Sequence, residues 1–286
     1  MPEKKAPIAL FCYNRPEHLN RTLEALRANH GASESRIYAF ADGAKDDVDE
    51  PGVLAVRGIL DSIDWCDSVE VVAQSDNLGL RASILSGVDQ VVNEHGRVIV
   101  LEDDIVTSPW FLTYMNDSLD KYQSYADVMH ISGFFLPVDG AELPETVFYR
   151  PTSCWGWATW KDSWANLERD AQTLLTRLKG KEQSFNLDGA YDFLNHLQLN
   201  VDGEISTWAI FWYASVFLAG GQCLHPSKSL VANIGHDGGG TNCQSTDCFN
   251  TTLRAERIED FPNEVQEHVV AFERARQFYL GNKGSV

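Results

Sequence analysis

Residues 97–105 read RVIVLEDDI, and this stretch decides how the rest of the chain is interpreted. Its apolar part, residues 98–101, is typical of a strand buried on both faces of a parallel sheet. Three acids, Glu102, Asp103 and Asp104, follow at once. Adjacent carboxylates that are buried together repel one another unless a cation neutralises them. The pattern indicates either a Mg²⁺ or Mn²⁺ site made of hard oxygen ligands or an exposed acidic turn that caps the next helix.

The composition limits the class of protein. The chain has 286 residues, 44% of them hydrophobic, which suffices for one large α/β domain. Its net charge of −18 predicts that nucleic acid and anionic membrane surfaces are repelled, so a phosphate-bearing substrate needs a metal ion or Arg side chains nearby. Residues 1–20 lack the apolar stretch of a signal peptide, and no integral membrane segment is expected anywhere in the chain.

The cysteines are scattered along the chain. Six occur in a chain too large to be a disulfide scaffold, which favours a reduced, cytoplasmic protein. Cys243 and Cys248 lie in one polar loop, where they could form a local bridge or half of a metal site. No second cysteine pair accompanies them, as a zinc site would require.

Strand and helix patterns alternate through the first hundred residues. Apolar runs predict strands at residues 7–13, 37–40, 69–73 and 98–101. Helices are expected from Pro16 to about residue 30, with Asn14 as the cap, then over residues 53–63, and then up to His95. Three such units feeding a fourth strand predict a parallel sheet with right-handed crossovers. Ligands bind beyond the carboxyl ends of strands in such sheets.

The second half is less regular and rich in aromatic residues. A helix is expected from Ser108 and Pro109 to about Tyr125, and further segments are a strand over 128–136, a strand over 222–234 with a Pro break, and a closing helix over 264–280. Residues 149–164 are dense in tryptophan, and aromatic residues recur at helical spacing over 208–217. Trp157 and Trp208 could stack on sugar rings, although core packing is the commoner role.

The order of these signals resembles that of a GT-A glycosyltransferase over about residues 6 to 242. The matching strand ends are Asn14-Arg15, Asp42-Gly43, Asn77-Leu78-Gly79-Leu80 and Glu102-Asp103-Asp104. Gly156-Trp157, the later Trp-rich helix and the glycine-rich loop are similar in order to the N-acetylglucosaminyltransferase that opens complex N-glycan synthesis, and to bacterial family 2-like sugar transferases. The resemblance implies a single GT-A domain over 1–286, with a nucleotide-sugar half (6–106) and an acceptor half (107–286) that includes a lid loop over 235–248.

The resemblance also implies a reaction, which is the metal-dependent, inverting transfer of a hexosyl or N-acetylhexosaminyl group. The donor would be a nucleotide-sugar, expected to be UDP-linked, and the acceptor a glycan or another hydroxyl compound. Mn²⁺ or Mg²⁺ would stabilise the charge on the leaving diphosphate. Asp104 would be the direct metal ligand, Asp103 a water-mediated ligand or a ribose contact, and Glu102 a contact to the nucleotide or donor sugar.

Further donor contacts follow from the same resemblance. The expected set is Arg15, Asp42, Asn77, Arg81 and His236, with Asp42 accepting from the base or ribose. His236 lies in a loop that folds over the donor in related enzymes, so contact with the metal or the pyrophosphate is expected there. The neighbouring glycines, residues 238–240, would let the backbone approach phosphate or act as a hinge.

Inverting transfer also needs a general base that takes the proton of the acceptor hydroxyl. In the family this carboxylate lies near the start of the helix that follows the aromatic acceptor segment, which leaves Asp202 and Glu204 here. Glu204 is favoured because it is nearer the helix, although the position next to Trp208, an acid in the N-glycan enzyme, is Thr207. Asp162 is a third candidate.

Two other functions compete. A sugar-phosphate nucleotidyltransferase would use a similar sheet, but it carries a Gly-rich signature with a basic residue directly after the first strand, and Asn14-Arg15-Pro16 is different. A non-catalytic carbohydrate-binding protein would explain the tryptophans, but it would not explain three adjacent acids.

Overall fold

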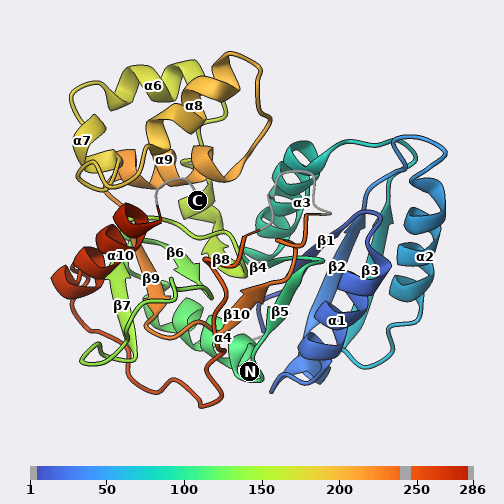
Figure 1. Ribbon diagram of the computed structural model, residues 1–286. Coiled ribbons are helices and arrows are strands. Elements are labelled where there is room, and N and C mark those ends of the chain that lie inside the picture. Colours follow the sequence, from blue (N-terminus) through green and yellow to red (C-terminus); the bar gives the residue numbers. More distant parts are fainter. Residues whose placement is uncertain (1–4, 239–245, 283–286) are drawn as a thin grey trace.

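A computed structural model describes residues 5–238 and 246–282 (Figure 1). Its centre is an eight-stranded sheet with the order β3-β2-β1-β4-β8-β6-β9-β7. The strands are β1 Ile8–Cys12, β2 Arg36–Ala41, β3 Ser68–Ala73, β4 Arg97–Glu102, β6 Val128–Ser132, β7 Thr146–Tyr149, β8 Trp157–Trp160 and β9 Gln222–Pro226. Helices cover both faces of the sheet, so the predicted α/β class is confirmed.

The first four strands form the predicted parallel unit. β1 pairs in parallel with both β2 and β4, and β2 pairs in parallel with β3. Between them run α1 Pro16–Arg27, α2 Glu50–Asp61 and α3 Leu80–His95. The strand order reverses direction between β1 and β4, and this kind of switch point opens a crevice at the carboxyl ends of the strands.

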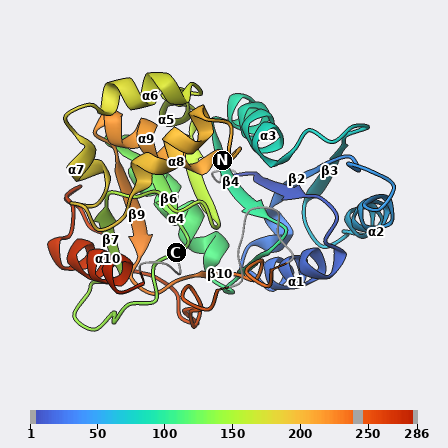
Figure 2. The ribbon, with the colours of Figure 1, turned by 45° about the horizontal axis from the view of Figure 1, so that its top comes forward.

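Successive side chains of each strand contact different helices, because they point to opposite faces of the sheet. Side chains of successive strand residues point to opposite faces, and here both faces are apolar. Ile99 and Leu101 pack in one core cluster with α1, α2 and α4 (Phe111–Tyr122), whereas Val98 and Val100 pack in another with α3 and α9 (Ala209–Ala219). Figure 2 shows α1 and α3 on opposite sides of these strands. The unbroken apolar run of β4 is therefore explained by burial on both faces.

The second half of the sheet is mixed. β8 runs antiparallel to both β4 and β6, β9 runs parallel to β6, and β7 closes the edge antiparallel to β9. The predicted strand over 222–234 divides after Pro226, because β10 (Val231–Asn233) leaves the main sheet and pairs with β5 (Ile105–Thr107). The predicted strand over 128–136 ends already at Ser132.

One predicted helix cap and one predicted helix start are wrong, whereas the predicted start of α1 at Pro16 is confirmed. Asn14 does not cap α1; its amide donates to Asp49 Oδ1 at 2.6 Å, and Arg15 occupies the cap position. The helix expected at Ser108 and Pro109 begins at Phe111, because residues 108–110 form a turn in which Ser108 Oγ accepts from the Trp110 N–H.

A layer of helices beside the sheet was not predicted. It contains α5 Lys161–Trp164, α6 Ala171–Leu178, α7 Glu182–Phe185 and α8 Phe193–Val201, followed by α9. Four indoles, those of Trp157, Trp164, Trp208 and Trp212, pack together between this layer and the sheet, with ring centroids 5.0 to 6.2 Å apart. The chain ends in α10 (Val269–Gly281).

Candidate functional site at the switch point

Arg15 and the acids 102–104 meet at the switch point between β1 and β4. Arg15 follows β1 and occupies the cap position of α1, while Glu102 is the last residue of β4. Arg15 Nη1 lies 3.2 Å from Asp104 Oδ2. The structure therefore brings together Arg15 and Asp104, which follow two different strands and are 89 residues apart in the sequence.

The three acids are crowded and poorly hydrated. Burial, followed by repulsion from Asp104 and Asp103, raises the pKa of Glu102 well above its usual range. Burial and Asp104 raise the pKa of Asp103 to about 7, although the Tyr13 N–H lies 3.3 Å from Asp103 Oδ2. Burial also raises the pKa of Asp104, against the opposing effect of Arg15 and His18. A cation bound at this turn would relieve the repulsion, whereas the alternative of an exposed capping turn does not fit.

The backbone after β10 is hydrogen-bonded to the acidic turn, which consists of residues 102–104. Ile234 N donates to the Asp104 carbonyl at 2.9 Å, next to the pairing of Asn233 with Ile105. A Cβ atom on Gly235 would lie only 2.1 Å from Asp104 Oδ2, so the absence of a side chain at residue 235 permits this close approach. The segment predicted to close over the donor therefore begins in contact with Asp104.

His236 lies in an aromatic cluster beside the acids. Its ring centroid is 5.2 Å from that of Trp155 and 5.6 Å from that of Phe249. His236 is also close enough to Asp104 to lower the pKa of that carboxyl group. The contact of His236 with a metal or with pyrophosphate stays a prediction, and the structure places the His236 ring close to Asp104.

Two residues of this site were not singled out from the sequence, namely His18 and Asp237. Asp237 Oδ1 lies 3.0 Å from Arg15 Nη2, and Asp237 Oδ2 lies 3.0 Å from His18 Nε2. His18 is three residues after Arg15, so the two side chains share one face of the first turn of α1. This spacing is the sequence pattern from which His18 could have been predicted. For Asp237 the sequence offers only its position directly after His236.

Asp42 lies at the end of β2 and is buried, and its carboxylate is engaged inside the protein. Oδ1 accepts from the N–H groups of Gly43 and Leu78, and Oδ2 accepts from the Gly79 N–H and the Asn77 amide, at 2.8 to 3.2 Å. Asp42 thus holds the loop before α3 against the end of β2. The predicted contacts of Asp42 and Asn77 with a nucleotide are not tested, but both residues shape this edge of the sheet.

We expect Asp42→Ala to lower the free energy of unfolding by about 2–3 kcal/mol, because four donors would lose a buried, charged acceptor. Urea denaturation measures this change. Asp46→Ala is the control, since the Asp46 carboxylate also accepts backbone N–H groups but lies in an exposed loop. Equal, small losses in the two variants would show that the Asp42 network does not stabilise the fold.

Arg81 connects α3 to the helical layer. Its Nη2 donates to the Arg169 carbonyl at 3.1 Å, and its guanidinium lies 4.1 Å from the centroid of the Phe211 ring. The start of α9 therefore lies beside the start of α3, which follows the carboxyl end of β3. The predicted contact of Arg81 with a base or phosphates is untested.

The connection from α8 to α9 carries both predicted candidates for the general base. Asp202 and Glu204 are exposed. Gln198 donates to Asp202 Oδ1 at 2.9 Å, and Asn200 closes the connection through hydrogen bonds with Thr207. Since the contact between Arg81 and Phe211 joins α9 to α3, this connection lies on the side of the helical layer that faces α3.

The structure rules out Asp162 as the base and bears out core packing as the role of Trp157 and Trp208. Asp162 lies two residues after β8, whose end at Trp160 pairs with Arg97 at the start of β4, so Asp162 lies at the end of β4 opposite the acids. Trp157 and Trp208 are only 0% and 4% exposed, so neither can stack on a sugar.

The antiparallel course of β8 places a different segment at the acids. Because Trp157 pairs with Val100, the residues before β8 lie near the carboxyl end of β4. Cys154 is close enough to Glu102 for that carboxyl group to raise its pKa, after the larger effect of burial. Trp155, partly exposed, comes next and contacts His236.

The residues fit a divalent metal in part. Within residues 5–238 and 246–282, no group of three or more His, Cys, Asp or Glu side chains is arranged to hold a metal ion. Magnesium in proteins is often held by one or two carboxylates, with water and substrate phosphates as the other ligands. The turn at residues 102–104 supplies the one or two carboxylates that such a site needs, and burial raises the pKa values of all three of its carboxyl groups.

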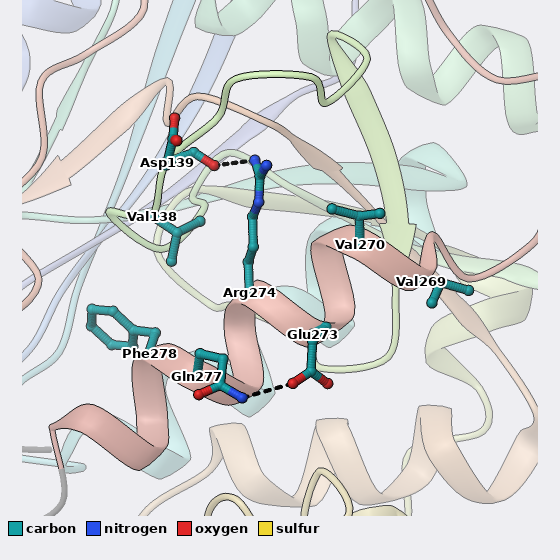
Figure 3. A pocket seen from close by; sticks show the side chains of 8 residues that line it. All are labelled: Val138, Asp139, Val269, Val270, Glu273, Arg274, Gln277 and Phe278. Atoms are coloured by element: carbon teal, nitrogen blue, oxygen red, sulfur yellow. Dashed lines mark hydrogen bonds between the residues drawn. The ribbon is translucent and has the colours of Figure 1, made fainter.

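Two cavities of the described residues lie elsewhere. One, of about 560 Å³ (Figure 3), is lined by Val138, Asp139, Val269, Val270, Glu273, Arg274, Gln277 and Phe278. The other, of about 640 Å³, adjoins it through Val138 and Asp139. Neither includes the acids 102–104.

Some expectations fall outside the part of the chain that the structure describes. They concern residues 239–245, which include most of the predicted glycine hinge, part of the lid loop and Cys243. Among the described residues, no helix has the length and apolar character needed to cross a membrane.

The comparisons with known proteins return structural similarities only. No protein-family model and no curated protein matches the sequence. The structure is similar to that of the mannosyltransferase PcManGT from Pyrobaculum calidifontis in complex with GDP-Man and Mn²⁺, with a TM-score of 0.39 and 10% identity over 77% of this chain and 71% of that one. It is also similar to residues 1–349 of S. aureus TarS, with a TM-score of 0.44 and 12% identity over 81% of this chain and 61% of that one.

Proposed function

We propose that the protein is a metal-dependent glycosyltransferase of the GT-A type, which moves a sugar from a nucleotide-sugar donor to a hydroxyl acceptor. The observation that carries the proposal is the buried acidic turn at the switch point, in contact with Arg15. Packing does not require three buried acids here, and their repulsion costs stability. A site that binds a cation and the diphosphate of a donor explains why three carboxylates and Arg15 lie together here.

Each residue then has a role in the proposed reaction. Asp104 holds Mn²⁺ or Mg²⁺, which when bound stabilises the negative charge on the departing diphosphate. Arg15 binds a phosphate group, and Glu102 and Asp103 orient the donor. Glu204, or Asp202 in its place, takes the proton of the acceptor hydroxyl in a single displacement that inverts the anomeric carbon.

Thermal unfolding with UDP, GDP and Mn²⁺ tests the proposal. A nucleotide and the metal together should raise the melting temperature more than the sum of their separate effects, because each ligand binds better when the other is present. UDP is the expected nucleotide, on the resemblance alone. A non-catalytic carbohydrate-binding protein would show no such shift, and a nucleotidyltransferase would instead form a nucleotide-sugar from UTP and a sugar phosphate.

A further inference from the structure

An anion is already bound by Arg15 and His18 in this structure, and it is the carboxylate of Asp237. One carboxylate oxygen lies 3.0 Å from Arg15 Nη2 and the other lies 3.0 Å from His18 Nε2. The same guanidinium reaches Asp104 Oδ2 through Nη1 at 3.2 Å. Arg15 is thus shared between a carboxylate of the acidic turn and a carboxylate of the segment after β10.

The place that Asp237 occupies suits a phosphate group. It lies at the first turn of α1, a 12-residue helix without a side-chain cap at its N-terminus. The N-terminus of a helix attracts anions through its unpaired N–H groups and its dipole. Arg15 adds a guanidinium, whose fork matches phosphate as well as carboxylate.

We infer that Asp237 is an internal competitor that fills the phosphate subsite of Arg15 and His18 until a donor displaces it. This inference rests on the proposed function, since it assigns that subsite to the diphosphate of the nucleotide-sugar. Asp237 is the most exposed member of the cluster, with 48% of its side chain accessible, against 17% for Arg15 and 17% for His18. The carboxylate can therefore move into water while Arg15 and His18 remain in place.

The backbone allows Asp237 to leave without disturbing the acids. Pairing of Asn233 with Ile105, and the hydrogen bond from Ile234 N to the Asp104 carbonyl, hold the chain up to residue 234. Gly235 N also donates to Asn233 Oδ1 at 2.7 Å. These contacts hold the chain up to Gly235 in place when the side chain of Asp237 moves.

The test compares Asp237→Asn with Glu17→Gln in the otherwise unchanged full chain. Both substitutions remove one negative charge near the start of α1, but Glu17 is exposed and only Asp237 contacts Arg15 and His18. Calorimetric titration with inorganic pyrophosphate, without metal, measures the affinity of the subsite for a diphosphate. This affinity falls when Asp237 occupies the subsite. If the subsite is filled by Asp237 about nine-tenths of the time, Asp237→Asn should bind pyrophosphate about tenfold more tightly than the unchanged protein.

The outcomes separate this inference from the proposed function. Glu17→Gln should bind pyrophosphate nearly as the unchanged protein does, and Arg15→Gln should lose the binding in the presence or absence of Asp237. An equal gain in both acid variants would mean a general charge effect, and no gain in Asp237→Asn would mean that Asp237 does not compete; either result overturns the inference. In those cases synergistic stabilisation by UDP and Mn²⁺ would still support the glycosyltransferase.

Discussion

Asp104→Asn is expected to weaken Mn²⁺-dependent binding of UDP by roughly 100-fold or more, because an amide cannot replace the anionic ligand that the metal requires. The substitution keeps the shape of the side chain. It should leave the fold intact, since burial already raises the pKa of Asp104 and a neutral group is tolerated there. Calorimetric titration of UDP in the presence of saturating Mn²⁺ measures the affinity.

The matched control is Asp61→Asn. Asp61 is exposed and lies at the last residue of α2, from which the chain runs to the start of β3 at the other edge of the sheet. It should bind UDP and Mn²⁺ as the unchanged protein does. Unaltered affinity in Asp104→Asn, with both variants folded, would mean that the acidic turn does not hold the metal.

Glu204→Gln is expected to lower the rate of sugar transfer by roughly 10²–10⁴-fold while the affinity for the donor stays the same. An acceptor hydroxyl attacks from the side opposite the diphosphate, so the base has to come from the half of the chain beyond the acids 102–104. The connection between α8 and α9 lies in that half, and the contact of Arg81 with Phe211 places the start of α9, which follows it, beside α3. Steady-state kinetics with a fixed donor measures the rate.

Asp202→Asn distinguishes between the two candidates. Asp202 accepts a hydrogen bond from Gln198, which restrains its carboxylate on α8. We therefore expect a much smaller loss of transfer in Asp202→Asn than in Glu204→Gln. The reverse order would move the role to Asp202, and normal transfer by both variants would remove this connection from the mechanism.

The parallel half of the fold was predictable because local and tertiary signals agree there. Residues 98–101 are apolar without a break, and the structure buries β4 on both faces between α1 and α3. The sequence predicted a parallel sheet, whereas the strand order 3-2-1-4 was visible only in the structure. The second half gave weaker signals, because its strands are short, its sheet is mixed, and β10 leaves the main sheet to pair with β5.

The candidate site shows where reasoning from sequence stops. The acids and Arg15 were predictable, since each follows an apolar strand and the ends of parallel strands share one edge. Asp42 was placed correctly at that edge, but three of its four hydrogen bonds depend on the exact path of the loop at residues 77–79. The contact of Asp237 with Arg15 joins residues 222 positions apart, and no local pattern encodes it. The burial of Trp157 and Trp208 agrees with core packing, the commoner of the two roles that the sequence offered.

Metal-dependent hydrolysis of nucleotide-sugars tests the central claim most directly, because it needs a donor site and a metal but no knowledge of the acceptor. UDP-, GDP-, dTDP- and CMP-sugars should be screened with Mn²⁺, with Mg²⁺ and with EDTA, using the unchanged protein and Asp104→Asn. The account predicts slow release of the nucleoside diphosphate from one class of donor, expected to be UDP-sugars, only with metal and only in the unchanged protein. Hydrolysis that persists in EDTA or in Asp104→Asn, or no hydrolysis of any donor, would contradict it.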